Sequence, residues 1–223
     1  MKTPTVDYRR FRFSRLNTPE FSHLKLLGGW IGYFILYFLT ENLIPASRCH
    51  VVHCALDDAI PFLEGFVIPY CLWYLLIAVS LAWFLLYDVD SFKKLQVYII
   101  ITQIVAMIVY IVWPSMQDLR PTEFPRDNFL SHVVAFIYAF DTPTGVCPSL
   151  HVAYSLGIAS TWCKCKGAPL WWKCAVVLLA AVICVATAFV KQHSVIDIFA
   201  ALPLGALAEV LTFYVIYPKK KTT

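Results

Sequence analysis

Apolar runs of about 20 residues alternate with short polar segments along most of the 223-residue chain. A helix needs about 20 mostly apolar residues to cross the hydrocarbon core of a bilayer, so each run predicts one membrane-spanning helix. The pattern therefore predicts an all-α protein, a polytopic membrane bundle with six transmembrane helices. These helices are expected at residues 26–44, 66–87, 95–114, 149–163, 172–190 and 195–217.

A shorter apolar run covers residues 129–140, between the third and fourth predicted spans. It is too short to cross a bilayer, so we expect a short helix that lies at the membrane interface or re-enters the membrane. The pattern shows no internal repeat and no soluble domain. Residues 26–217 thus form a single predicted membrane domain.

The composition supports a membrane protein, because 60% of the residues are hydrophobic and only 14% are charged. A soluble domain of this size needs a larger charged shell. Residues 1–25 contain six Lys and Arg residues and no apolar run, which predicts a basic cytosolic tail rather than a cleaved signal peptide. The cations gather at helix ends instead of forming one patch, and this argues against nucleic acid as a partner.

Lys and Arg are distributed unevenly between the two sides of the predicted membrane. Fourteen of the 18 lie in the termini and around the connections 88–94 and 164–171. Basic loops remain in the cytosol, so both termini, including the basic tail 218–223, are expected there. The exceptions on the outward side are Arg48, Arg120, Arg126 and Lys191. Together with the His, Asp and Glu residues of that side, they predict an extracytoplasmic site.

Two features bear on the cellular compartment, for which the cytoplasmic membrane of a bacterium is our first expectation. Lys220 and Lys221 resemble a dilysine signal for retrieval to the endoplasmic reticulum, although a positive-inside flank explains them more simply. Cys49 and Cys54 lie in an outward connection and form a disulfide if that compartment is oxidising. The alternative is a zinc site that includes the neighbouring histidines, but the spacing fits no standard site.

Three polar clusters fall at outward ends of predicted helices, namely Arg120–Pro121, Pro148–His151 and Lys191–Asp197. A helix bundle can bring such ends into one site. A polar, turn-rich run ends at Pro148, a residue type that suits the start of a helix, and we expect Ser149, Leu150 and His151 to open the helix. The backbone N–H groups of Ser149, Leu150 and His151 would then be free to bind an anion.

Phosphoryl transfer is the chemistry that these clusters fit. Arg120 would hold two phosphate oxygens with its planar guanidinium group, and the Ser149 hydroxyl would bind another. Lys191 would add a point charge. With these cations present, no metal or other cofactor is required.

The two histidines supply the groups that would make and break bonds. Either His151 or His193 would attack phosphorus, and the other would protonate the leaving oxygen. Asp197 lies four residues after His193 and would orient its ring.

Each candidate also has a purely structural interpretation. Arg120 is alternatively an interfacial anchor, and Lys191 is alternatively a side chain extended to lipid headgroups. His151 is alternatively a polar residue at a helix start. Asp197 fits the capping pattern S-x-x-D with Ser194 and would then serve its own helix. These interpretations explain poorly why three outward helix ends all carry cationic or titratable groups.

At these residues the sequence resembles the type 2 phosphatidic acid phosphatase superfamily of membrane lipid phosphatases and phosphotransferases. The family pattern is K-x6-R-P, then P-S-G-H, then S-R-x5-H-x3-D, on a six-helix bundle. The matching residues are Arg120 and Pro121, then Pro148, Ser149 and His151, then His193 and Asp197. The resemblance covers the chain from about residue 30 onward. Segments 57–70 and 141–151 look like the branch related to inositol phosphorylceramide synthases.

The resemblance implies a role for each matching residue. His193 is the expected nucleophile that forms a phosphohistidine, Asp197 orients it, and His151 is the general acid for the leaving alcohol. Arg120 and Ser149 are expected to bind the phosphate group.

The chain departs from the family pattern at several positions. Trp113, Leu150, Ala186 and Thr187 stand where the family has Lys, Gly, Ser and Arg. Two cations of the expected phosphate site are therefore missing. Lys191 is the expected substitute, and Arg126 is a second candidate.

Three functions remain open at this point. The first is a lipid phosphatase that hydrolyses a lipid phosphomonoester or diphosphate through a phosphohistidine at the outer face. The second is a lipid phosphotransferase, similar to inositol phosphorylceramide synthase, that passes the phosphoryl headgroup to an alcohol. The third is a non-enzymatic lipid-binding or transport protein on a degenerate phosphatase scaffold. The expected partners are the membrane and a lipid phosphate.

Overall fold

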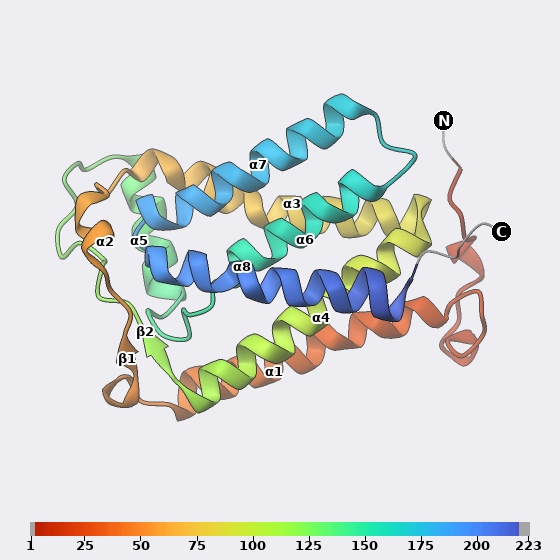
Figure 1. Ribbon diagram of the computed structural model, residues 1–223, viewed down its shortest axis with the longest axis horizontal. Coiled ribbons are helices and arrows are strands. Elements are labelled where there is room, and N and C mark those ends of the chain that lie inside the picture. The colour runs from red at the N-terminus through yellow and green to blue at the C-terminus, as the bar shows by residue number, and fades with distance from the viewer. Residues whose placement is uncertain (1–2, 219–223) are drawn as a thin grey trace.

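The apolar runs form helices close to the predicted bounds in the computed structural model, which describes residues 3–218 (Figure 1). The α-helices are α1 (Gly28–Leu43), α2 (Ala55–Ala59), α3 (Val67–Tyr87), α4 (Val89–Val112), α5 (Phe129–Phe140), α6 (Leu150–Lys164), α7 (Leu170–Phe189) and α8 (Val195–Val210). A π-helical turn, Leu211–Ile216, continues α8. The prediction of an all-α fold is confirmed, and α5 is a helix with the predicted bounds.

Strand structure among the described residues is limited to β1 (His50–Val51) and β2 (Ser115–Met116), which pair in parallel. Short 3₁₀ turns cover Tyr8–Arg10, Phe13–Arg15, Ser22–Leu27, Ala46–Arg48 and Glu64–Phe66. The two strands join the connection before α2 to the connection after α4. They lie at the same end of the molecule as α2 and α5 (Figure 1).

Four helical segments are long and apolar enough to cross a membrane, at residues 64–87, 89–112, 170–189 and 195–216. The two other predicted spans are shorter, because α1 has 16 residues and α6 has 15. The structure therefore supports a membrane protein with four helices of spanning length. It does not confirm six.

The long helices lie roughly along one axis, with α6 between α3, α4, α7 and α8 (Figure 1). Close approach depends on two glycines that face Tyr98 of α4. A Cβ atom at Gly157 of α6 would overlap the Tyr98 ring, and one at Gly205 of α8 would lie 2.9 Å from the Tyr98 hydroxyl. Because α6 packs against protein on several sides, it needs less apolar surface than a helix that faces lipid.

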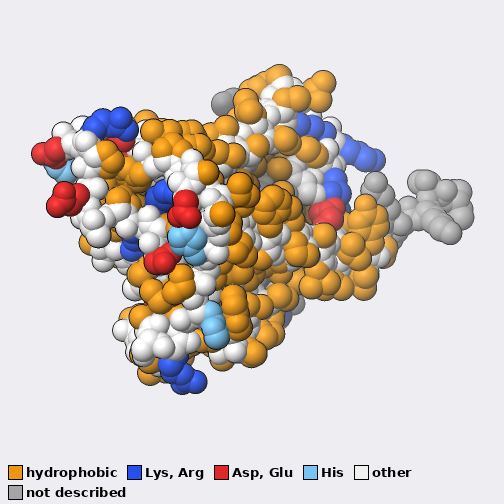
Figure 2. Space-filling view, turned by 60° about the vertical axis from the view of Figure 1, so that its left-hand side comes forward, with side chains coloured by type: hydrophobic (Ala, Val, Ile, Leu, Met, Phe, Trp, Pro, Cys, Tyr) orange, Lys and Arg blue, Asp and Glu red, His pale blue; other side chains and the backbone are white. Residues whose placement is uncertain are grey.

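The outer helices carry large apolar side chains on the surface of the molecule. Examples are Phe34 on α1, Leu178 on α7 and Phe199 on α8, which are 59%, 67% and 62% exposed. Figure 2 shows a broad apolar surface, with charged side chains gathered toward the ends. Exposed apolar area of this extent is typical of a surface that contacts lipid.

The two described chain ends lie at one end of the bundle, opposite α2, α5 and the strands (Figure 1). The N-terminal segment folds onto this end instead of extending from it. The Tyr8 hydroxyl donates a hydrogen bond to the Leu85 carbonyl at 2.8 Å, and the Thr5 N–H donates to Leu86 at 2.8 Å. The Lys220–Lys221 signal and most of the predicted tail 218–223 lie outside the described residues.

Candidate functional site

The two histidines meet at the end of the bundle opposite the chain termini, where α6 begins and α7 connects to α8. The connection turns sharply, and Lys191 has a left-handed backbone with φ of 53°. The backbone N–H groups of Gln192 and His193 then donate to the Thr187 carbonyl at 3.0 and 3.2 Å. These bonds fix the segment that carries His193 against the end of α7.

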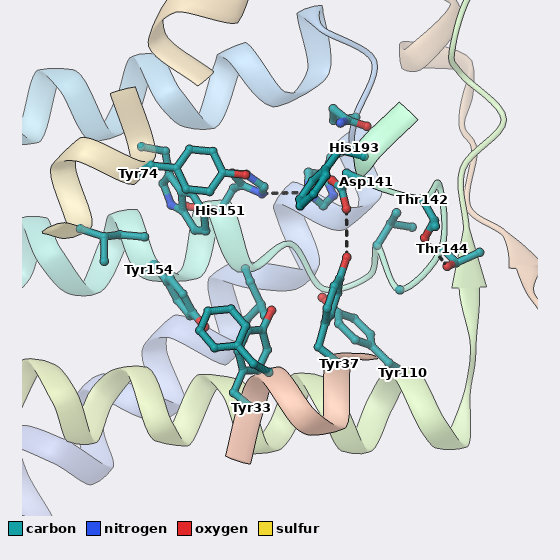
Figure 3. Close-up of a pocket in the computed structure, with 18 of the residues that line it drawn as sticks. Tyr33, Tyr37, Tyr74, Tyr110, Asp141, Thr142, Thr144, His151, Tyr154 and His193 are labelled. Carbon is teal, nitrogen blue, oxygen red and sulfur yellow. Dashed lines mark hydrogen bonds between the residues drawn. The ribbon is translucent and has the colours of Figure 1, made fainter. Parts of the chain in front are cut away.

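The structure brings His193, His151 and Asp197 into direct contact. Figure 3 shows the contact between the two histidines. His193 Nδ1 lies 3.2 Å from Asp197 Oδ2, and His193 Nε2 lies 3.3 Å from His151 Nδ1. Asp197 is fully buried and His193 is 7% exposed. A carboxylate at Nδ1 fixes that atom as the donor, which leaves the lone pair of His193 on Nε2.

Asp197 serves its helix and His193 at the same time. Its Oδ2 atom accepts the Ser194 N–H at 2.9 Å, and the Ser194 hydroxyl accepts the Ile196 N–H at 3.1 Å. These bonds form the capping box that the S-x-x-D pattern predicts. Capping holds the carboxylate in one place, so Asp197 contacts His193 while it caps α8.

A second buried carboxylate, that of Asp57 in α2, accepts hydrogen bonds from the residues that begin α8. It accepts hydrogen bonds from the Ser194 hydroxyl at 2.6 Å, the Val195 N–H at 2.8 Å and the Cys54 N–H at 2.8 Å. Burial raises the pKa of Asp57. The hydrogen bonds together lower it by more than burial raises it, so the pKa lies below its ordinary value. Sequence reasoning missed this role, because Ser194 is 137 residues away along the chain.

Lys191 does not reach the histidines. Its amine donates to the carbonyl oxygens of Asp57 and Ile60 at 2.7 and 2.6 Å, at the end of α2. Burial lowers the pKa of this amine, and the carboxylates of Asp57 and Asp58 oppose that shift. The predicted phosphate contact is therefore replaced by a contact that ties α2 to the segment before His193.

Arg120 lies near the site, but protein acceptors occupy both terminal nitrogens of its guanidinium, while its buried Nε atom has no partner among the described residues. It donates to the carbonyl oxygens of Tyr138 and Asp141 at 3.1 and 2.9 Å and to Gln192 Oε1 at 2.6 Å. The group also packs over the Tyr138 ring, 4.5 Å from its centroid. Arg120 thus acts as a clamp between the end of α5 and the segment before α8.

Arg126 does not replace a missing cation at the histidines. Its guanidinium pairs with both oxygens of Glu64 at 2.6 and 2.7 Å, and Asn128 donates to the same carboxylate at 2.9 Å. Trp113 stacks on His50, and Thr187 is buried, so neither position supplies a cation near the histidines.

Ser149 caps α6 instead of presenting a free N–H group. The helix begins at Leu150, one residue after the predicted start of the span at residue 149. The Ser149 N–H donates to the Asp197 carbonyl at 3.1 Å, and its hydroxyl accepts the Val152 N–H at 3.4 Å.

A cavity of about 360 Å³ opens beside the histidines. Its walls are mostly aromatic side chains of α1 and α3, namely Trp30, Tyr33, Phe34, Tyr37, Trp73 and Tyr74. Asp141, Thr142 and Thr144 form a polar side of the same cavity (Figure 3). The Tyr37 hydroxyl donates to Asp141 Oδ1 at 2.9 Å. Among residues 3–218, no Lys or Arg side chain lines this cavity.

No candidate metal centre is found within the described part of the chain. Across residues 3–218, no group of three or more His, Cys, Asp or Glu side chains is placed to hold a metal ion. Cys49 and Cys54 are free thiols in the structure, and Cys49 donates a weak hydrogen bond to the Pro45 carbonyl. The cavity with His151 and His193 is therefore the candidate site.

In comparisons with protein-family models, curated proteins and solved structures, no match to this chain was found.

Proposed function

We propose that this protein is an integral membrane enzyme that cleaves a phosphoester bond in a lipid through a phosphohistidine on His193. The observation that carries the proposal is the chain of contacts Asp197–His193–His151 beside an aromatic cavity. The cavity offers an apolar space for part of a lipid, and the histidines offer a nucleophile and a proton donor at its base.

In the first step, His193 Nε2 attacks phosphorus and the bond from phosphorus to the leaving oxygen breaks. In the complex with an anionic phosphate group, His151 carries a proton and gives it to that oxygen, so the alcohol leaves neutral. The phosphorylated imidazole of His193 carries a positive charge, which the Asp197 carboxylate stabilises through Nδ1–H. The phosphoryl group takes the place of the direct His193–His151 contact.

In the second step, neutral His151 removes a proton from a water molecule or an alcohol. The resulting oxygen attacks the phosphoryl group, and the bond from phosphorus to His193 Nε2 breaks. This returns both histidines and Asp197 to their starting protonation states, and His151 acts as the acid in the first step and as the base in the second.

We further propose that α1 and α6 complete a bundle of six spans. The 3₁₀ turn Ser22–Leu27 runs directly into α1, and together they are long enough to cross a bilayer of about 30 Å. Helix α6 is surrounded by other helices and does not need full spanning length. The basic residues near the chain termini then place the histidine end on the outward side of the membrane.

Transfer to an alcohol is the second candidate, and the aromatic cavity favours it. Apolar walls that continue to His193 limit the access of water and leave room for a lipid hydroxyl group. Release of phosphate or phosphorylated headgroup should be measured with and without added alcohol acceptors. A constant yield of hydrolysis product at every acceptor concentration would exclude transfer.

The central test compares wild type with His193→Ala in a lipid panel containing phosphatidate, isoprenyl diphosphate, phosphatidylglycerophosphate and sphingolipid substrates. We expect His193→Ala to lower turnover by at least about 10³-fold and to abolish acid-labile phosphoryl labelling. The matched control is His132→Ala, since His132 is an exposed residue of α5 outside the cavity. Full turnover by His193→Ala would rule out the mechanism.

A further inference from the structure

We propose that the side-chain amide of Gln192 binds a phosphoryl oxygen of the substrate, and that Arg120 is the positioning residue that holds this amide. The inference rests on the proposed function, because it assigns the oxygen donor of the same reaction. It also gives the chain a substitute for the cations that Trp113 and Thr187 replace.

The orientation of the amide follows from its contact with Arg120. Gln192 Oε1 accepts a hydrogen bond from Arg120 Nη2 at 2.6 Å. A guanidinium group has only donors, so the carbonyl oxygen of the amide must face it and the NH₂ group must point away. Arg120 itself is held by the carbonyl oxygens of Tyr138 and Asp141.

The NH₂ group of Gln192 is placed to serve a ligand. Gln192 lines the cavity next to His193 and is 4% exposed. Its Nε2 atom has no hydrogen-bond partner within the described residues. Burial of an unpaired amide donor is unfavourable, and a phosphoryl oxygen in the cavity would satisfy it.

No cation of the described chain competes for this role at the cavity. Lys191 and Arg126 are engaged elsewhere, with carbonyl oxygens and with Glu64. The charged side chain on the polar side of the cavity is Asp141, a carboxylate. A neutral donor beside a carboxylate suits a phosphoryl group of low charge, and it stabilises the charge that develops on phosphoryl oxygens during transfer.

The first test replaces the donor while preserving the contact with Arg120. Gln192→Glu keeps the side-chain length and still accepts from Arg120, but it presents an acceptor where the NH₂ group stood. We expect kcat/KM to fall by about 10²–10³-fold and inhibition by orthovanadate to weaken in parallel. Gln192→Met removes the donor without adding a charge and is expected to produce a smaller loss in both measurements.

The matched control is Gln117→Glu. Gln117 is also buried and also has an unpartnered Nε2 atom, but it does not line the cavity. If the proposal is correct, Gln117→Glu leaves the vanadate inhibition constant unchanged in the folded fraction. Arg120→Lys keeps the positive charge but loses the planar, two-pronged guanidinium group. It should lower kcat while the unfolding temperature stays close to that of wild type.

The outcomes separate this inference from the proposed function. If wild type forms phosphohistidine and Gln192→Met keeps both wild-type kcat/KM and wild-type vanadate inhibition, the role of Gln192 is refuted and the mechanism stands. If wild type shows no turnover and no labelling of His193 with any lipid in the panel, the proposed function fails and this inference fails with it.

Discussion

The two ends of the helix bundle use charged residues in opposite ways. At the end with the chain termini, charged side chains pair near the surface, as in Lys93–Asp90, where the partners are 34% and 83% exposed and 3.6 Å apart. At the histidine end, Asp57 and Asp197 are 2% and 0% exposed. Each of these carboxylates accepts hydrogen bonds from both backbone and side-chain groups.

The difference shows which end is built to hold a fixed geometry. An exposed ion pair contributes about 0–1 kcal/mol to stability, so the end with the termini tolerates change. A buried carboxylate is stable only while its donors remain in place, and the loss of one donor leaves an unsatisfied charge. The histidine end is therefore the more sensitive part of the molecule, both for stability and for chemistry.

The largest effect after the loss of His193 is expected from Asp197→Asn. The asparagine side chain can still accept the Ser194 N–H, so the cap of α8 is largely kept. It cannot stabilise the positive charge on phosphorylated His193, and we expect kcat to fall by about 10²–10⁴-fold. Steady-state kinetics with a thermal unfolding curve would check this, and an unchanged kcat would show that Asp197 acts only as a cap.

Asp57→Ala should reduce stability by about 2–4 kcal/mol, because it leaves the Ser194 hydroxyl and two backbone N–H groups without their acceptor. The folded-state pKa of Asp57 is lower than its ordinary value. Its contribution is therefore complete above the ordinary range of an aspartate and is lost as the pH falls through the lower folded-state pKa. Thermal unfolding in detergent should show the difference between wild type and Asp57→Ala shrinking in acid, and a gap that widens in acid would contradict this assignment.

The middle of the bundle is tested by Gly157→Ala. The added methyl group overlaps the Tyr98 ring, so α4 and α6 must separate, at a cost of about 1–3 kcal/mol. Gly32→Ala in α1 is the control, because a Cβ atom there meets nothing within 4 Å. Unfolding temperatures should fall for Gly157→Ala and remain level or rise for Gly32→Ala. Equal behaviour of the two variants would mean that the helices do not approach as described.

The smallest effect is expected from Asp90→Ala, the counterpart of Asp57→Ala at the opposite end. It removes an exposed carboxylate with one cationic partner, and stability should change by no more than about 0.5 kcal/mol. Thermal unfolding under the conditions used for Asp57→Ala gives the direct comparison. A loss as large as that of Asp57→Ala would remove the distinction between the two ends.

The sequence predicted the helices well where composition alone decides the outcome. The predicted span 66–87 differs from α3 by one residue, and the predicted helix 129–140 coincides with α5. The prediction was poorer for the third span, since α4 begins at Val89 rather than near residue 95. Its first two turns contain Asp90, Lys93 and Lys94, which look like a loop but are a polar helix end capped by Asp88.

The same division applies to the site. The meeting of His151, His193 and Asp197 was predictable because each lies at an outward end of a predicted helix and Asp197 follows His193 by four residues. The contacts of Asp57, Gln192 and Lys191 were not predictable, because they depend on side chains that reach across the fold to distant backbone groups. Lys191 shows this clearly, since its left-handed backbone directs the amine to α2 and away from the cavity.

The bond between Asp57 and the start of α8 has a consequence for biosynthesis. The ribosome makes Asp57 early, whereas Ser194 and Val195, which satisfy its carboxylate, emerge only near the end of translation. Until then, the Asp57 carboxylate of α2 lacks the donors that Ser194 and Val195 supply. We therefore expect unfinished chains in the membrane to be chemically inert, so that a reactive imidazole arises only in a nearly complete polypeptide.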